Sequence, residues 1–419
     1  MVIWQYATTL KHGKEYRMKK YDLLTPEGTR DLLFDESVAR RTVEDKLRQL
    51  FDSYGYSEVI TPGLEFYDVF TLKTRYFAQE NMYKLSDAKG RLMVLRPDST
   101  MPIARLAATR LKDEVYPLKL FYNQNIFRIN PKNSGRDDEI TQSGIEIIGG
   151  DPKRADMEAL NLATEVLKAC AINDFRLEIG DSAFFKALIS KVTDDDDEIE
   201  EIRSYIENKN FPELRAALKK YPVSSETSAL EALPGLFGGT EVFEKAEDVL
   251  KNTDTAPILN ELKNVYDYLS ELGVRDKITI DFGLVNKANY YTGIVFRGYI
   301  QGYGMSVLSG GRYDTLIGDF GLNLPATGFA VNINAATNAF LKSNNEPLSN
   351  PVQVLVYANE DSLRAGFVHC RNLLANGIRA ENSLHDSLDA AKEYARRKGI
   401  AKIEIVEKNE NITEINPFD

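Results

Sequence analysis

The stretch 139–148 constrains the fold of this chain most, because polar and apolar residues alternate along it. Successive side chains of a β-strand point to opposite faces of the sheet. Gln142 and Glu146 therefore share one face, and Ile145 and Ile147 share the other. The alternation predicts a sheet with one packed face and one face that holds a polar pocket.

Other strand and helix patterns surround this stretch. Apolar runs bounded by turn residues predict strands at 82–85, 92–95, 118–128, 277–284, 291–300 and 327–331. Apolar residues at helical spacing predict helices at about 37–54, where Gly55 ends the pattern, and at 153–170. The glycine-rich stretch 309–314 is typical of turns. Together these patterns predict an α+β fold, an antiparallel sheet with flanking helices.

The same patterns divide the chain into regions. We expect a disordered extension at 1–20, in which Met18 is a possible alternative start, and a large α+β domain at 21–340. Helical patterns fill residues 181–273, an insertion whose acidic run from Asp194 to Glu198 suits a helix start. A turn-rich linker at 341–351 leads to a small C-terminal α/β domain at 352–419.

Composition excludes several classes of protein. The 419 residues carry a formal charge of −11, so no overall positive field attracts nucleic acid. There are two cysteines, expected to be buried, and three histidines, which leaves little material for disulfides or a metal site. Neither a transmembrane stretch nor a secretory signal is visible, and we expect a cytoplasmic protein. No phosphate-binding glycine motif follows a strand.

Three groups of residues occur in a specific order. They are Leu95-Arg-Pro-Asp-Ser-Thr100 followed by Phe127-Arg128, then Gly135-Arg136 followed by Gln142-Ser-Gly-Ile-Glu146, then Asn289-Tyr-Tyr-Thr-Gly-Ile-Val-Phe296 followed by Gly310-Gly-Arg-Tyr-Asp314. The order resembles the catalytic domain of histidyl-tRNA synthetases, a class II aminoacyl-tRNA synthetase family, over about residues 21–340. The tail resembles a shortened form of that family's anticodon-binding domain. Thr61-Pro62 falls where the class has the proline of its dimer interface.

The resemblance implies a histidine pocket. Its matching positions here are Asp98, Thr100, Arg128, Gln142, Glu146, Tyr290 and Tyr291. The chemistry of these side chains fits such a ligand independently. Carboxylates accept N–H groups, tyrosine hydroxyls and the amide of Gln142 can bond an imidazole, and Arg128 suits a carboxylate or a phosphate.

Three departures from the family fall on the ATP side of that pocket. The family's Arg-Gly-Leu-Asp is replaced by Asn286-Lys-Ala-Asn289, so the arginine that supports amino-acid activation is missing. The Glu-Arg that ends the third class motif is Asn334-Ala335, and the glutamate that contacts adenine is Asn130. Adenylate formation depends on cations that stabilise the phosphoryl transition state. Lys287 lacks the planar fork of arginine, so we expect no catalysis by this chain.

A histidine pocket without ATP-binding residues resembles the family of ATP phosphoribosyltransferase regulatory subunits, which are paralogues of histidyl-tRNA synthetases. Membership implies a short catalytic partner subunit, the first step of histidine biosynthesis, feedback inhibition by histidine, and a hetero-octamer built on a regulatory-subunit dimer. It implies neither a cofactor nor tRNA binding. The alternatives are an active histidyl-tRNA synthetase, a synthetase-like regulator of another partner, and an amino-acid ligase that does not act on tRNA.

Overall fold

The computed structural model describes residues 23–71, 78–131, 135–170, 174–285, 291–301, 303–343, 348, 351–409 and 411–419. The expected extension at 1–20 and the site residue Tyr290 lie outside this range. The chain divides into two compact units, Met1–Asn345 and Glu346–Asp419. Among the described residues, no helix has both the length and the apolar composition that crossing a bilayer requires.

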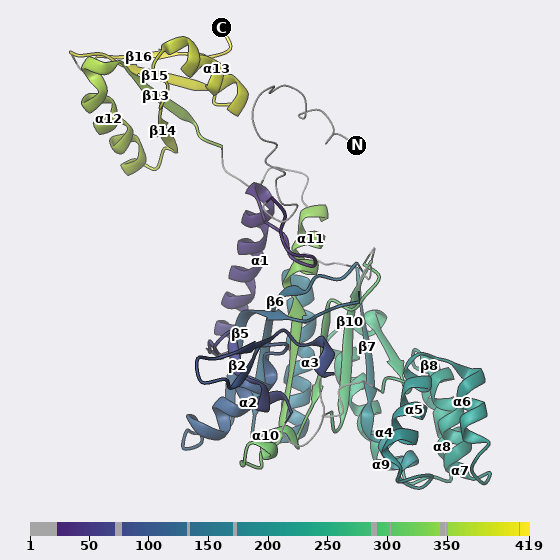
Figure 1. Ribbon diagram of the computed structural model, residues 1–419. Coiled ribbons are helices and arrows are strands. Elements are labelled where there is room, and N and C mark those ends of the chain that lie inside the picture. Colours follow the sequence, from purple (N-terminus) through teal and green to yellow (C-terminus); the bar gives the residue numbers. More distant parts are fainter. Residues whose placement is uncertain are drawn as a thin grey trace, which may run out of the picture. The chain divides into compact units, whose positions relative to one another are not determined.

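A nine-stranded sheet forms the centre of the first unit (Figure 1). Its strands, in spatial order, are β1 (Ser57–Glu58), β5 (Leu118–Phe127), β6 (Glu139–Ile148), β12 (Ala326–Asn332), β11 (Leu308–Arg312), β10 (Ile294–Ile300), β7 (Phe175–Asp181), β9 (Ile278–Asp281) and β8 (Phe237–Gly238). Neighbouring strands are antiparallel except for the pairs β1–β5 and β7–β9. The predicted α+β fold with an antiparallel sheet is confirmed.

Helices α1 (Phe34–Ser53), α3 (Pro152–Ala169) and α11 (Ile333–Ser343) cover one face of this sheet. Ile145 and Ile147 are buried on that face, as their alternation predicted. The ring of Phe51 from α1 meets the ring of Phe329 from β12 at a centroid distance of 6.4 Å. Gly55, with φ +77°, follows the end of α1, because glycine adopts this left-handed conformation without strain.

Smaller elements cover part of the opposite face, which we call the pocket face. They are helix α2 (Thr100–Thr109), helix α10 (Leu316–Asp319) and a three-stranded sheet of β2 (Leu64–Phe66), β4 (Leu92–Leu95) and β3 (Lys84–Ser86). Strands β3 and β4 form the predicted hairpin. Buried residues of these elements pack against β5 and β6, so the pocket face combines apolar packing with a polar centre.

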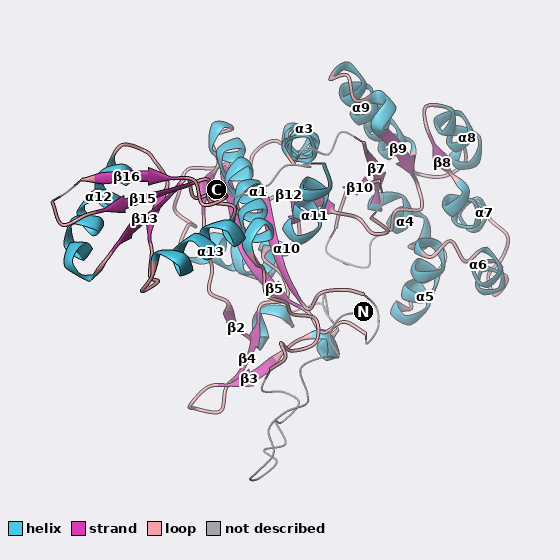
Figure 2. Cartoon of the chain, turned by 90° about the horizontal axis from the view of Figure 1, so that it is seen from above, coloured by secondary structure: helices cyan, strands magenta, loops and turns pink. Residues whose placement is uncertain are grey.

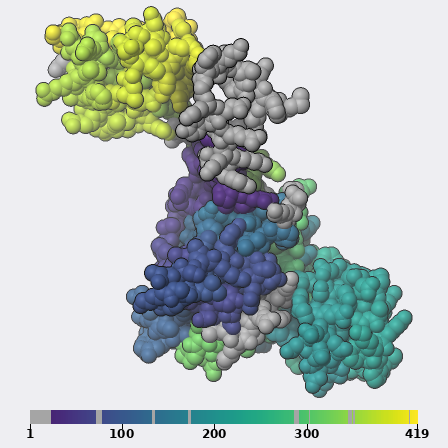
Figure 3. Space-filling model, in the orientation of Figure 1, coloured from purple at the N-terminus to yellow at the C-terminus, as the bar shows by residue number. Residues whose placement is uncertain are grey.

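The predicted helical insertion follows β7. It contains α4 (Ser182–Ile189), α5 (Asp196–Glu207), α6 (Phe211–Leu218), α7 (Ser225–Ala232), α8 (Glu241–Leu250) and α9 (Ala256–Glu271). Asp195 in the acidic run caps α5, accepting the backbone N–H groups of Asp197 and Glu198. Helices α5 to α8 gather beside the β7–β9 end of the sheet (Figure 2), and their surface forms a lobe of its own (Figure 3).

The second unit is a small α/β structure. Its four-stranded sheet has the order β14 (Ala380–Asn382), β13 (Val354–Ala358), β15 (Lys402–Val406) and β16 (Ile412–Ile415), with helices α12 (Leu363–Ala375) and α13 (Leu388–Lys398). Strands β13, β14 and β15 are parallel, and β16 is antiparallel to β15. Cys370 on α12 is buried, as is Cys170 in the first unit, which confirms the expectation for both cysteines.

One local prediction is wrong. Residues 308–312 form the central strand β11 rather than turns, because the glycines there permit close strand contact. A Cβ atom at Gly310 would lie 2.4 Å from the carbonyl oxygen of Gly328 on the neighbouring strand. Strand β7 was not expected either, although Phe175, Leu177 and Ile179 alternate with polar residues along it.

Candidate functional site

Glu146 lies on the pocket face, on β6, and is 1% exposed. Its carboxylate accepts hydrogen bonds from the hydroxyl of Thr100, at 2.7 Å, and from the hydroxyl of Tyr313. Gly328 lies opposite on β12, where a Cβ atom would approach Glu146 Oε2 to 2.1 Å. Burial raises the pKa of Glu146 to about 8, and the charge of Asp98 adds to this, while the two hydroxyl groups oppose it.

Asp98 and Arg128 place opposite charges at one side of Glu146. Asp98 Oδ1 accepts the backbone N–H of Met101 at 3.0 Å, at the start of α2. Arg128 Nε donates to the carbonyl of Pro97 at 2.7 Å, and its Nη2 lies 3.9 Å from Asp98 Oδ2. Burial raises the pKa of Asp98, although Arg128 opposes this shift. A carboxylate beside a guanidinium suits the ammonium and carboxylate groups of an amino acid.

Three tyrosines, Tyr122, Tyr291 and Tyr313, belong to the buried cluster around Glu146. Tyr291 lies against Gly311, where a Cβ atom would be 2.8 Å from its ring. The hydroxyl of Tyr122 would be 2.7 Å from a Cβ atom at Gly144. Burial, together with the charge of Glu146, raises the pKa of Tyr122. The Tyr122 hydroxyl therefore keeps its proton, as a hydrogen-bond donor for a ligand must.

Tyr122 and Tyr313 were not among the expected site residues. Tyr313 belongs to the segment Gly310-Gly-Arg-Tyr-Asp314 and follows Gly311 by two residues, so strand alternation could have predicted that it shares a face with Gly311. Tyr122 is directly opposite Gly144 in the β5–β6 register, and this pairing cannot be read from either strand alone.

The seven expected residues are not all in one place. Five lie together on the pocket face: Asp98, Thr100, Arg128, Glu146 and Tyr291. Gln142 is half-buried on the same face of β6, four residues from Glu146, or about 13 Å at roughly 3.3 Å per residue. It pairs with Gln124 and Asn332 on the neighbouring strands. Tyr290 is outside the described residues, so the candidate site consists of the five and the two additional tyrosines.

Asn130 and Asn334 stand where we expect histidyl-tRNA synthetases to carry ATP-binding residues, and both side chains form hydrogen bonds within the protein. Asn130 donates to the backbone carbonyl of Asp137 at 2.9 Å. Asn334 donates to the Asp137 carboxylate at 2.9 Å. These positions therefore offer neutral amides beside a carboxylate, an environment that repels the phosphates of a nucleotide. Asn286 and Lys287 are outside the described residues.

A polar hollow of about 360 Å³ adjoins Asn334 and contains three arginines. Each of them is paired with a glutamate of α1. Arg30 contacts Glu36, and Arg40 and Arg41 contact Glu44 at 2.9 and 2.6 Å. The positive charge of the hollow is therefore largely neutralised within the protein, and we assign it no phosphate.

The buried carboxyl of Glu146 predicts a pH-dependent stability. In the unfolded chain this group ionises near its ordinary pKa of 4.5, but in the folded protein only near 8. Between these values the folded state holds a proton that the unfolded chain has lost, so the stability from this group falls progressively as pH rises from about 4.5 to about 8. Relative to Glu146→Gln, we expect the wild-type free energy of unfolding to fall by up to about 1.4 kcal/mol per pH unit.

Urea unfolding of the ligand-free protein from pH 5 to pH 8 measures this difference. Glu139→Gln is the matched control, because Glu139 lies on the same strand with its side chain on the opposite face. Parallel pH profiles for the wild type and Glu146→Gln would contradict the raised pKa.

The chain is similar to known proteins over most of its length. The family model described as histidyl-tRNA synthetase matches residues 28–336. An ATP phosphoribosyltransferase regulatory subunit of Clostridium acetobutylicum is 42% identical over 404 residues, covering 96% of this chain and 98% of its own length. One from Bacillus cereus strain G9842 is 40% identical over 402 residues, covering 95% of this chain and 94% of its own length.

Solved structures show the same fold. A structure from Bacillus halodurans C, described as an ATP phosphoribosyltransferase regulatory subunit/histidyl-tRNA synthetase, superposes with a TM-score of 0.78 at 30% identity. The superposition covers 90% of this chain and 97% of the Bacillus halodurans chain. Histidyl-tRNA synthetase from Nostoc sp. PCC 7120 has a TM-score of 0.73 at 22% identity, covering 95% and 97% of the two chains, which supports the fold alone.

Proposed function

The chain belongs to the family of ATP phosphoribosyltransferase regulatory subunits, which have the histidyl-tRNA synthetase fold, and we propose that it senses histidine for the catalytic subunit. It is a regulatory subunit without catalytic activity of its own. The enzyme that it regulates joins ATP to phosphoribosyl pyrophosphate in the first step of histidine biosynthesis. A regulatory subunit at that step needs a site for the end product.

One observation carries the proposal: the amino-acid half of the site is intact while the nucleotide half is not. Glu146, held by Thr100 and Tyr313, and the pair Asp98–Arg128 offer partners for every polar group of an amino acid. At the other end, the amide of Asn334 donates to Asp137 where the family has its ATP-clamping arginine motif. Such a site suits histidine binding without activation.

Histidine fits the buried centre of the site better than an apolar amino acid does. An imidazole ring carries N–H groups that a buried carboxylate and tyrosine hydroxyls can bond. An apolar ligand side chain of the same size would form no hydrogen bond with the Glu146 carboxyl or the tyrosine hydroxyls. Polar groups without a partner are costly in a buried site. We therefore propose Asp98, Thr100, Arg128, Gln142, Glu146, Tyr290 and Tyr291 as histidine-binding residues, together with Tyr122 and Tyr313.

Calorimetric titration of the purified chain with histidine tests this function. ATP titration and a histidine-dependent pyrophosphate-exchange assay are run beside it. We expect saturable histidine binding and no exchange. Robust exchange would instead identify an active synthetase, and failure of histidine to bind, alone or with the catalytic subunit present, would refute the sensor.

The proposed assembly pairs this chain with a short catalytic subunit in a cytoplasmic hetero-octamer. Histidine inhibits such an assembly if it binds the inactive state more tightly than the active state, because a ligand shifts an equilibrium only by its differential affinity. Neither tRNA nor a membrane has a role in this proposal.

A second copy of this chain is the proposed partner for the exposed face of the three-stranded sheet. Leu64, Phe66 and Leu85 share that face and are 46%, 42% and 42% exposed. The opposite face carries Val94, which is fully buried. An exposed apolar cluster of this kind is typical of a protein interface. The adjoining Thr61-Pro62 lies where the synthetase class has its dimer contact, which favours a symmetric dimer.

We expect Phe66→Glu to shift the dimer toward monomer, because it places a charge in the apolar interface. Light scattering after gel filtration measures the mass over a dilution series. Val223→Glu is the control, since Val223 is 94% exposed on the helical insertion and should change nothing. A dimer that persists undiminished in Phe66→Glu would exclude this face.

A further inference from the structure

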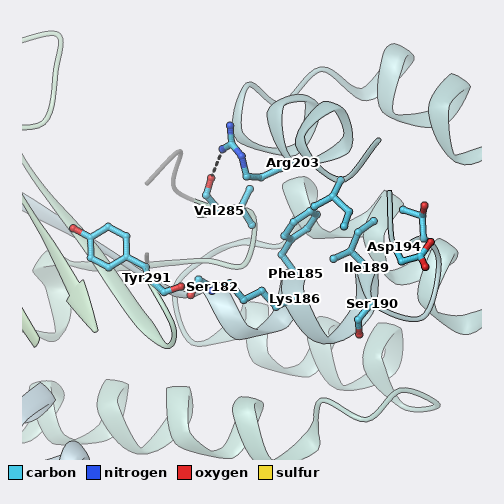
Figure 4. Close-up of a pocket in the computed structure, with 11 residues that line it drawn as sticks. Ser182, Phe185, Lys186, Ile189, Ser190, Asp194, Arg203, Val285 and Tyr291 are labelled. Carbon is cyan, nitrogen blue, oxygen red and sulfur yellow. Dashed lines mark hydrogen bonds between the residues drawn. The ribbon is translucent and has the colours of Figure 1, made fainter. Parts of the chain in front are cut away.

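The chain segment that carries Tyr291 into the pocket is held at both ends by the helical insertion. Before the segment, the carbonyl of Val285 accepts a hydrogen bond from Arg203 Nη1 of α5 at 3.0 Å (Figure 4). At its other end, the carbonyl of Tyr291 accepts a hydrogen bond from Lys186 Nζ of α4. Two basic side chains of the insertion thus bind main-chain oxygens on either side of residues 286–290.

Arg203 is itself fixed by two glutamates. It is 4% exposed, and its guanidinium pairs with Glu200 and Glu207, each at 2.6 Å. Glu207 also binds Arg297 of β10 at 2.9 Å. Helix α5 therefore contacts the chain on both sides of Tyr291. Its Arg203 binds Val285 before Tyr291, and its Glu207 binds Arg297 after it. A buried arginine with this many charged partners has a well-defined position.

Side-chain packing between the insertion and this segment is incomplete. A cavity of about 310 Å³ separates them, and Arg203, Lys186, Val285 and Tyr291 all line it. In Figure 4 the ring of Tyr291 points toward the sheet, away from the insertion helices. Beside this cavity, hydrogen bonds connect the insertion to the chain around Tyr291: those of Arg203 and Lys186, and those that the backbone N–H and the hydroxyl of Ser182 donate to the carbonyl of Gly293 at 2.9 and 3.1 Å.

We propose that Arg203 and Lys186 are positioning residues that hold Tyr291 in the histidine pocket, so that the helical insertion controls the affinity for histidine. The inference rests on the proposed function, because Tyr291 is a proposed ligand residue. Displacing the main chain at Val285 or Tyr291 moves the Tyr291 ring out of contact with the ligand, although neither basic side chain touches histidine.

Histidine titration of full-length variants tests the proposal. We expect Arg203→Met and Lys186→Met each to raise the Kd for histidine about tenfold or more, and Arg203→Lys to recover part of the Arg203→Met loss. Lys186 is exposed on α4, so its replacement should leave the fold intact even if Arg203→Met does not fold. Arg215→Met is the control, because it removes an exposed ion pair with Glu231 elsewhere in the insertion.

Hydrogen exchange of the ligand-free protein gives a second readout that does not depend on histidine. We expect faster amide exchange at residues 291–293 in Lys186→Met, with β12 unchanged, and no change at either place in Arg215→Met. Wild-type affinity together with wild-type exchange in Lys186→Met would overturn the proposal. A wild-type protein that binds no histidine would instead refute the proposed function, and the exchange rates would still decide whether the insertion holds the segment.

Discussion

Glu146→Ala is expected to lower the affinity for histidine by about 100-fold or more. The carboxylate is fully enclosed, and its Thr100 and Tyr313 partners orient it toward the pocket. Removing this carboxyl leaves an N–H group of the bound imidazole buried without a partner, which costs up to roughly 3 kcal/mol for a neutral group and more for a charged one. Every 1.4 kcal/mol corresponds to a tenfold change in Kd, so the expected loss is about two orders of magnitude. Calorimetry with histidine measures it directly.

Two further variants separate the causes of this loss. Glu146→Gln keeps the volume and removes the charge, so its loss should be smaller if hydrogen bonding dominates and equal if charge dominates. Glu139→Ala is the matched control on the same strand, where the side chain faces away from the pocket and accepts a hydrogen bond from Asn125 at 2.7 Å. A folded Glu146→Ala protein with wild-type affinity would mean that histidine binds elsewhere.

The same variants connect binding to regulation. In the enzyme reconstituted with its catalytic subunit, the histidine concentration that gives half-inhibition should rise in Glu146→Ala by the same factor as the Kd, because inhibition derives from binding. Unchanged inhibition together with lost binding to the isolated chain would place the regulatory site on the catalytic partner.

The faces of the sheet could be predicted from sequence because side-chain direction has a strict period of two residues in a strand. Ile145 and Ile147 alternate with Glu146, so these three residues are enough to predict one packed face and one polar face of the sheet. The start of α5 could also be predicted from local sequence, because Asp195 provides the oxygen that accepts hydrogen bonds from the first N–H groups of the helix. Both features depend only on neighbours in the chain.

The features that sequence analysis missed depend on contacts between distant segments. Gly310 and Gly311 are typical turn residues, and only the close approach of Phe329 and Tyr291 shows why a strand needs them. Tyr122 lies in the site because it pairs with Gly144 in the β5–β6 register. No local sequence pattern shows how these two strands align. Gln142 shares a face with Glu146, but alternation gives direction and not contacts, so only the structure shows that Gln142 lies beside Gln124 and Asn332.

Gly328→Ala is expected to lower the free energy of unfolding by about 3 kcal/mol or more, beyond the roughly 1–3 kcal/mol usual for overpacking. Gly328 lies in β12 between β6 and β11, and a Cβ atom there would lie 2.1 Å from Glu146 Oε2 and 2.3 Å from the carbonyl of Ile145. The Glu146 side chain can move at some cost, but the Ile145 carbonyl belongs to a central strand. The two strands must therefore separate, or the pocket must lose Glu146.

Urea unfolding of both Gly328→Ala and Gly304→Ala measures this effect. Gly304 is the matched control, because a Cβ atom at this position has nothing within 4 Å. Replacing a glycine with alanine at an unstrained site reduces the entropy of the unfolded chain, so Gly304→Ala should be neutral or slightly stabilising. Histidine binding should also weaken in Gly328→Ala and stay unchanged in Gly304→Ala, since only the first methyl group occupies space that Glu146 needs. Equal stability in the two variants would show that the strands tolerate a side chain beneath Glu146, and that glycine at 328 is not what creates the pocket.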